Sequence, residues 1–122
     1  MITGVMTASA ACIVVELRGD HGQIETVEAI VDTGFTGFLT LALPLIARLG
    51  FPYEGNMEAT LGDGSETLMD MFSGAVRWHG HLREGTVLAA DGPPLIGMEL
   101  LRGSRVTLEV EEGGLVFLEP LP

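Results

Sequence analysis

The sequence predicts an all-β fold, mainly antiparallel, with one or two short helices. Roughly eight short runs of β-branched and apolar residues recur along the chain of 122 residues. Turn-forming residues, including 17 glycines and 6 prolines, separate these runs. Only two segments carry the start and stop signals of a helix, and both are short. A chain of this size fits one domain, and a compact barrel or sandwich is the expected architecture.

The first predicted strands form a hairpin. Residues 12 to 17 and 24 to 31 are β-branched runs, and the turn-rich connector RGDHGQ separates them. The second of these strands leads directly to Asp32, which therefore lies at a strand end. An extended segment, FLTL, follows. Pro44 and Gly50 then bracket a short helix over LPLIARLG.

Further hairpins are predicted in the second half of the chain. Strands at 57 to 61 and 67 to 78 are joined by the tip Gly62-Asp63-Gly64-Ser65, whose glycines permit positive φ. A turn at His79-Gly80-His81 leads to the strand GTVLAA, which Asp91-Gly92-Pro93-Pro94 ends. LIGMELLRG then predicts a short apolar run, a glycine and two turns of helix. VTLEV and LVFLE form a closing hairpin.

Charge and composition exclude several classes of function. The net charge is -11, all 6 basic residues are Arg, and no basic cluster exists to bind a phosphate backbone, so we expect no nucleic-acid partner. The longest apolar run, FLTLALPLIARLGF, is interrupted by polar residues and proline and falls short of the ~20 residues of a membrane span. The single Cys12 is expected to be a buried strand thiol. The residues before it lack the basic and long apolar regions of an export signal, so the expected location is cytoplasmic.

An acidic residue, Asp32, directly follows the apolar run Ala29-Ile30-Val31. By itself Asp32-Thr33-Gly34 is a common loop sequence, in which the carboxylate caps backbone N–H groups. About 60 residues later, Leu95-Ile96-Gly97 places two apolar residues and a glycine before a predicted helix. The order of these segments resembles the retroviral-type (retropepsin-like, clan AA) aspartic proteases, within them the bacterial and archaeal branch whose motif reads Asp-Thr-Gly-Phe.

The resemblance covers nearly the whole chain and implies one domain, residues 1–122, folded as a single-lobe retropepsin-like acid protease barrel. It implies that Asp32, Thr33 and Gly34 form the catalytic motif. It also implies that LGDGSE, residues 61 to 66, carries a flap with its tip at Gly62, Asp63, Gly64 and Ser65. Leu95, Ile96 and Gly97 support the active-site loop. Phe35 stands where retroviral enzymes carry a small residue, and we expect it to fill the core beneath the cleft rather than to line the cleft.

Peptide hydrolysis by water needs a base and an acid at the same time. Two carboxyl groups held close together share one proton, because repulsion raises one pKa, as the aspartic proteases illustrate. This chain has one Asp-Thr-Gly, so the second copy is expected from a twofold-related chain. The expected function is therefore a homodimeric aspartic endopeptidase that acts on peptides or proteins without a cofactor.

Other chemistries have less support. His79 and His81 lack a third metal ligand nearby, so we expect no metal. The chain has no lysine and no P-loop, and neither a serine nor a cysteine nucleophile has a suitable context. The methionines at 57, 69, 71 and 98 are expected to fill the core. Two alternatives stay open: a noncatalytic module that binds extended peptides by strand addition, and a monomeric β barrel in which Asp32 only caps its loop.

Overall fold

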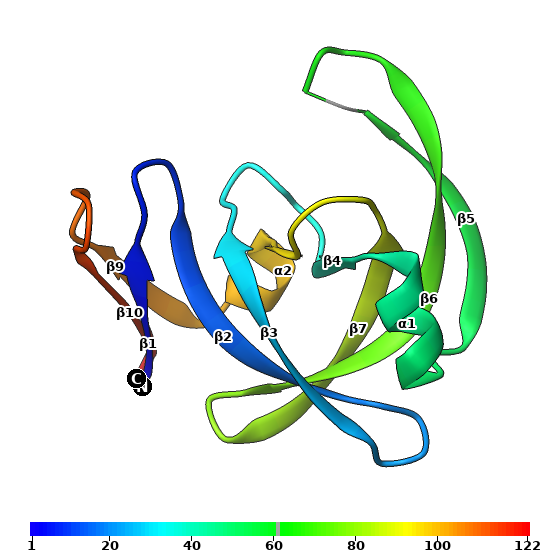
Figure 1. Ribbon diagram of the computed structural model, residues 1–122, viewed down its shortest axis with the longest axis horizontal. Helices are drawn as coiled ribbons and strands as arrows, with labels where there is room; N and C mark the ends of the chain where they lie inside the picture. Colours follow the sequence, from blue (N-terminus) through cyan, green and yellow to red (C-terminus); the bar gives the residue numbers. More distant parts are fainter. Residues whose placement is uncertain (61) are drawn as a thin grey trace.

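The computed structural model describes residues 1–60 and 62–122. Over these residues the chain is mostly β, with one mixed sheet of ten strands and two short helices (Figure 1). The elements in chain order are β1 (Ile2–Met6), β2 (Ala11–Arg18), β3 (Ile24–Val31), β4 (Leu39–Leu41), α1 (Leu43–Leu49), β5 (Tyr53–Thr60), β6 (Glu66–Trp78), β7 (His81–Ala89), β8 (Leu95–Ile96), α2 (Met98–Leu101), β9 (Ser104–Leu108) and β10 (Leu115–Pro120).

The strands lie in the order β5-β6-β7-β4-β8-β3-β2-β1-β10-β9, and β6 also pairs with β2. Across the described residues, eight of the ten strand pairings are antiparallel. The pairings β3 with β8 and β4 with β7 are parallel. The predicted all-β class is therefore confirmed. The sheet is mixed because the short strands β4 and β8 each pair in parallel with one longer strand.

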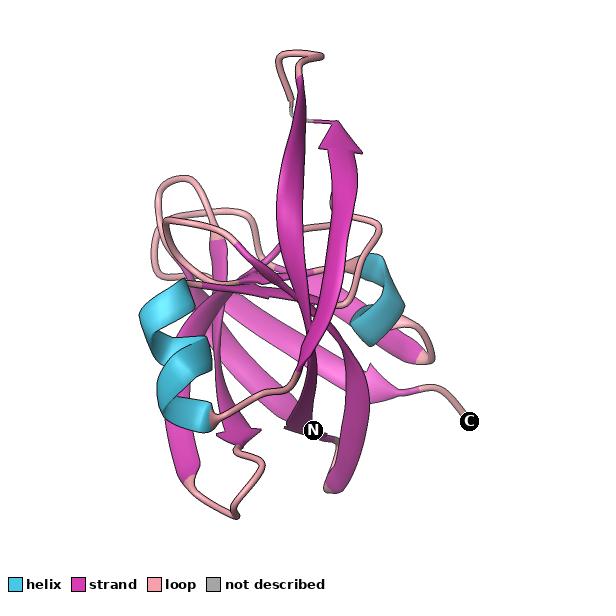
Figure 2. Cartoon of the chain, turned by 90° about the vertical axis from the view of Figure 1, so that its right-hand side faces the viewer, coloured by secondary structure: helices cyan, strands magenta, loops and turns pink. Residues whose placement is uncertain are grey.

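The hairpin formed by β5 and β6 projects from the rest of the molecule (Figure 2). The outer part of β6 is exposed or half-buried, whereas Gly74, Val76 and Trp78 near its end are buried. The tip from Gly62 to Ser65 is exposed. The predicted strand 57 to 61 and the predicted flap segment both include Leu61, which lies outside the described residues.

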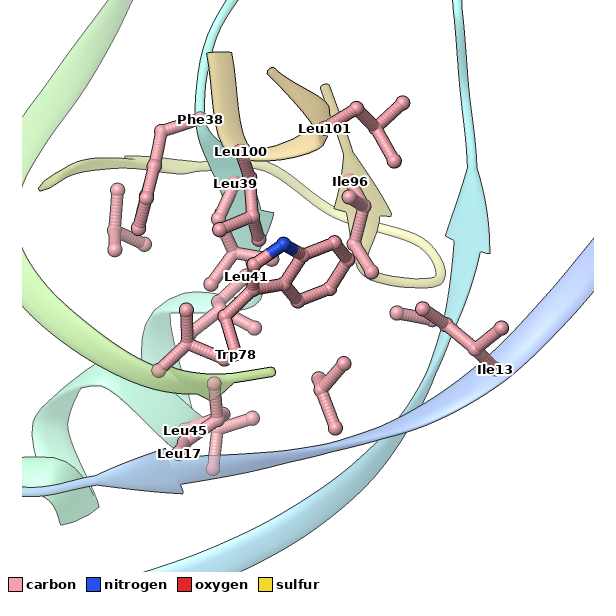
Figure 3. Packing of buried hydrophobic residues seen from close by; sticks show 14 of the residues in the cluster. Ile13, Leu17, Phe38, Leu39, Leu41, Leu45, Trp78, Ile96, Leu100 and Leu101 are labelled. Atoms are coloured by element: carbon pink, nitrogen blue, oxygen red, sulfur yellow. The ribbon is translucent and has the colours of Figure 1, made fainter. Parts of the chain in front are cut away.

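Trp78 lies at the centre of the core, with only 2% of its surface exposed (Figure 3). Leu39 and Leu41 of β4 and Leu100 of α2 pack around it. Strand β2 contributes alternate residues, as a strand with one buried face does. A buried indole removes about 150–250 Å² of surface from water, so this side chain dominates the packing.

The prediction of core methionines is wrong. Met57 and Met98 are 41% and 47% exposed, and Met69 and Met71 are half-buried. Their strands and helix start were predicted, but these positions lie on the projecting hairpin and on the surface of α2. Cys12 is likewise only half-buried, because its neighbours on β2 face the core instead.

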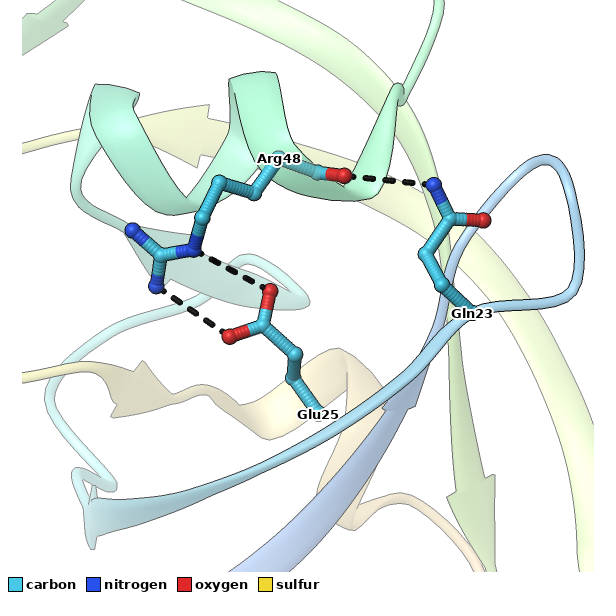
Figure 4. Close-up of polar contacts among 3 residues, drawn as sticks. All are labelled: Gln23, Glu25 and Arg48. Carbon is cyan, nitrogen blue, oxygen red and sulfur yellow. Dashed lines mark hydrogen bonds and ion pairs between the residues drawn. The ribbon is translucent and has the colours of Figure 1, made fainter.

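The helix α1 matches its prediction. Pro44 lies in its first turn, and Gly50 after its end adopts φ 67° and donates its N–H to the carbonyl of Ala47 at 3.1 Å. Arg48 binds Glu25 of β3 with two hydrogen bonds of 3.1 and 3.3 Å, and its carbonyl accepts a hydrogen bond from Gln23 (Figure 4). Because the Arg48 side chain is 61% exposed, this ion pair contributes at most about 1 kcal/mol.

Several elements differ from the predictions. Strand β5 begins at Tyr53 rather than at residue 57, and β7 begins at His81 rather than at residue 85. The strand β1 was not predicted; it is held by pairing with β2 and β10. Helix α2 has one turn rather than two. Strand β9 ends at Leu108. The N–H of Glu109 then donates to the carbonyl of Leu115 at 2.9 Å across the following turn. Within the described residues, neither helix has the length and apolar character needed to cross a membrane.

Candidate active site

Asp32 begins a loop, residues 32–38, that follows β3 and is called the Asp32 loop below. The amide of Asp32 donates to the carbonyl of Ile96 at 2.9 Å, and its Oδ1 accepts the N–H of Gly34 at 2.9 Å. The N–H of Phe35 donates to the carbonyl of Asp32 at 3.2 Å. These bonds fix the half-buried carboxylate at the strand end. The hydrogen bond from Gly34 is also what the simpler interpretation predicts, in which Asp32 only caps its loop.

The segment from β8 to α2 supports the Asp32 loop from behind. Strand β8 lies between β3 and β4, and the N–H of Leu95 donates to the Thr40 hydroxyl at 3.0 Å. Three successive amides, those of Gly97, Met98 and Glu99, then donate to loop carbonyls. Their acceptors are Phe38, Phe35 and Gly37, at 3.1, 2.8 and 3.1 Å. The structure thus brings together the two segments that the sequence singled out.

Gly97 is required at its position by space. A Cβ built there would collide with the carbonyl oxygen of Gly37 and lie 2.6 Å from the Phe35 ring. The backbone of Gly97 is extended, with φ -98°, so its conformation alone would admit other residues. The close approach of two backbones therefore excludes a side chain.

The expectation that Phe35 fills the core is wrong. Phe35 is half-buried, packs against Gly97 and Gly37, and lines a groove on the outer side of the loop. Phe38, three residues further on, takes the core position and is 2% exposed. The reason is that Phe38 leads into the buried strand β4, whereas Phe35 lies within the turn.

A groove of about 630 Å³ lies between the Asp32 loop and the β5–β6 hairpin. The loop lines it with residues from Gly34 to Phe38, and β7 contributes Thr86 and Leu88. The hairpin wall and α2 supply residues that the sequence did not indicate as functional: Met57, Glu58, Ala59, Thr60, Met71 and Glu99. The four residues 57–60 of β5 are consecutive, so no alternation of apolar residues in the sequence marked this wall of the groove.

A second hollow, of about 810 Å³, lies on the other side of the Asp32 loop. Thr33 lines this second hollow, while Thr36 and Glu99 line both. Asp32 itself lines neither hollow in the single chain. Thr33 is exposed, so its hydroxyl is available to a group outside this chain.

The predicted flap tip is a well-defined turn at a distance from the groove lining. Oδ1 of Asp63 accepts the N–H of Ser65 at 2.9 Å and its hydroxyl at 2.6 Å. These hydrogen bonds lower the pKa of Asp63 below its usual value. Gly62 to Ser65 are not among the residues that line the groove, so within one chain the hairpin wall, not the tip, faces the Asp32 loop.

The two histidines singled out by the sequence do not form a metal site. Nε2 of His79 lies 2.8 Å from the hydroxyl of Ser104, while His81 is exposed. Among residues 1–60 and 62–122, no group of three or more His, Cys, Asp or Glu side chains is placed to hold a metal ion.

Comparison of the sequence with models of known protein families finds no match, and comparison with characterised proteins finds none either. The geometry around Asp32 is therefore the basis on which a function can be inferred.

Proposed function

We propose that this chain is a cytoplasmic aspartic endopeptidase that acts as a homodimer. The observation that carries the proposal is the position of Asp32. It stands at the end of a strand, on a loop held from behind by the amides of residues 97–99, and the loop forms one side of a groove. A loop held in this way keeps a carboxylate in a fixed position, as acid–base catalysis requires.

The topology supports a single-domain retropepsin-like barrel. Starting from β6, the pairings run through β7, β4, β8, β3 and β2, and β2 pairs again with β6. This circuit closes on itself, as the pairings of a barrel do. Strand β3 leads to Asp32, and β8 leads to Gly97. The two strands are parallel neighbours, so both segments leave the circuit at the same edge.

The proposed reaction uses two Asp32 carboxyl groups, one from each copy, that share a proton. The ionised carboxylate takes a proton from water while the water oxygen attacks the peptide carbonyl carbon. The protonated carboxyl donates its proton to the carbonyl oxygen of the peptide. When the tetrahedral intermediate breaks down, the carboxyl that took the water proton donates it to the nitrogen, a hydroxyl of the intermediate returns a proton to the other carboxylate, and the C–N bond cleaves to release an amine. No metal or cofactor takes part.

The proposed substrate is an extended peptide in the groove. Strand β5 is an edge of the sheet, so its outer N–H and C=O groups have no strand partner among the described residues. Such an edge offers hydrogen bonds to a peptide that lies alongside it. The Asp32 loop forms the opposite side of the groove. Because Asp32 itself does not line the groove within one chain, the scissile bond is proposed to lie at the dimer axis, where the two Asp32 carboxyl groups would meet.

Replacing Asp32 by Asn tests the proposal with little change to the loop. The amide oxygen of Asn still accepts the Gly34 N–H, so the fold is expected to persist. Peptide cleavage should fall by about 100-fold or more, because the base is lost. Asp91→Asn, in an exposed turn, is the matched control and should keep full activity. Undiminished cleavage by Asp32→Asn would refute the assignment.

A mixing experiment tests whether the two acids come from separate copies. Adding excess Asp32→Asn chains to the wild type, with time for subunit exchange, should suppress cleavage, because mixed dimers carry only one ionisable Asp32. Excess Asp91→Asn chains should not suppress it. Activity that stays constant per wild-type chain, or a wild type that binds peptides without cleaving them, contradicts the proposal.

A further inference from the structure

We propose that Glu99 makes the groove selective for peptides in which a large apolar residue lies beside a basic one, arginine or lysine. This inference rests on the proposed peptidase function, since it concerns the substrate of the same groove. It combines two features: the groove has an apolar lining, and Glu99 has a backbone held by hydrogen bonds and an exposed side chain.

The backbone of Glu99 is held on both sides. Its N–H donates to the carbonyl of Gly37 at 3.1 Å, and its own carbonyl accepts a hydrogen bond from Nη2 of Arg83 at 3.1 Å. Its contribution to the fold therefore comes from the main chain. The side chain is exposed at the groove, and removing its charge leaves these hydrogen bonds in place.

The carboxylate of Glu99 is not neutralised by an ion pair within the described residues, where the pairs are Arg48 with Glu25 and Arg77 with Glu16. Arg83 directs its guanidinium to the carbonyls of Glu99 and Leu100 instead. Arg102 shares the second hollow with Glu99 but does not line the groove, and no ion pair joins the two among the described residues. A basic substrate side chain is therefore the complementary partner for this acid.

The lining around Glu99 determines what lies beside the basic side chain. Phe35, Phe38, Met71 and Leu88 give the groove an apolar lining, and no basic residue belongs to the described lining. Glu58, on the hairpin wall, is a second acid in this lining and attracts a basic side chain in the same direction as Glu99. The net charge of -11 adds a long-range attraction for cationic peptides. Charge complementarity and the apolar lining thus select the same class of peptide.

Two sets of three synthetic peptides test the inference. Each set shares one large apolar residue and places Arg, Gln or Glu directly before it or directly after it. We expect the wild type to favour the Arg peptide over the Gln peptide by about fivefold in kcat/KM in at least one set. Glu99→Gln should remove most of this preference, Glu99→Lys should reverse it, and added salt should weaken it. Glu112→Gln, which removes the same charge from a distant exposed turn, should preserve it.

Fluorescence polarisation of labelled peptides on Asp32→Asn separates this inference from the proposed function. Arg-selective binding that Glu99→Gln removes, without cleavage by the wild type, would support the selectivity and refute the peptidase. Cleavage with equal rates for Arg and Gln peptides, or a preference that Glu99→Gln leaves intact, would overturn the inference and leave the peptidase standing. Absence of both binding and cleavage would overturn both.

Discussion

The amide of Met98 donates a hydrogen bond of 2.8 Å to the carbonyl oxygen of Phe35. This bond joins the start of α2 to the loop that begins at Asp32, and parallel bonds from Gly97 and Glu99 flank it. Three successive amides facing three loop carbonyls leave the two backbones with little freedom to separate. The position of Asp32 is therefore set by residues more than half the chain away.

Replacing Gly97 by Ala should destabilise the protein by about 2 kcal/mol or more, because the new Cβ meets a backbone oxygen that cannot rotate away. Urea unfolding followed by circular dichroism measures the effect. Gly62→Ala is the matched control, since a Cβ there meets nothing within 4 Å. Equal stabilities for the two variants would show that the packing of Gly97 against Gly37 is not tight.

Arg83→Lys should loosen α2 while keeping the charge. The guanidinium donates to the carbonyls of Leu100 and Glu99 at 2.9 and 3.1 Å, and an ammonium cannot reproduce both bonds with the same geometry. We expect a loss of about 1–2 kcal/mol in the free energy of unfolding. Arg105→Lys, at an exposed position on β9, should change it little. A loss at Arg105 as large as at Arg83 would contradict this account of α2.

Acidification should destabilise the fold through His79. Burial lowers the pKa of His79 below its usual 6.5, and nearby positive charges, including Arg83, act in the same direction. The unfolded chain then binds the proton more readily than the folded one. The stability that depends on neutral His79 is thus complete above the unfolded pKa of about 6.5 and falls as the pH drops towards the lower folded pKa.

The slope of unfolding free energy against pH measures this effect. His79→Asn should flatten the slope between about pH 7 and 5, because the titrating group is gone. Asn is chosen since it tolerates the φ of 50° at this position. His81→Asn, at an exposed position, should keep the wild-type slope. If both variants keep it, His79 does not titrate differently in the two states.

The affinity of the proposed dimer should rise on mild acidification. Each chain carries -11, so a dimer carries twice that, -22, and protonation of carboxylates reduces the repulsion between subunits. Sedimentation velocity at about pH 7 and pH 5, with the salt concentration held constant, measures the change. An affinity that stays the same or falls would argue against charge repulsion as the main opposing force.

The sequence allowed the strand order along the chain to be predicted well, because turn residues mark nearly every boundary. The hairpin at 12 to 17 and 24 to 31, and the helix bracketed by Pro44 and Gly50, appear in the structure. The strand Ile2–Met6 was missed because its pattern is weak and it is held by its neighbours β2 and β10. The intrinsic strand propensity of these residues does not include the stabilisation that comes from pairing with neighbouring strands.

The candidate site was only partly predictable. A motif and its spacing singled out Asp32 and Gly97, and the structure brings their two segments together, while their catalytic roles stay predictions. The exposure of Met57 and the groove-lining position of Phe35 were not predicted, because they depend on how the hairpin twists and where the turn ends. Glu99 had no pattern of its own; its position in the groove lining depends on the fold, in which its N–H donates to the carbonyl of Gly37.

Strand β6 runs without a break from the projecting hairpin into the core, where Val76 and Trp78 are buried and Arg77 pairs with Glu16 of β2. One strand therefore spans two regions of unequal local stability. We expect its outer amides to exchange with solvent through local opening of the hairpin, and its inner amides to exchange only on global unfolding. Local opening of the outer hairpin would then change access to the groove without unfolding the core.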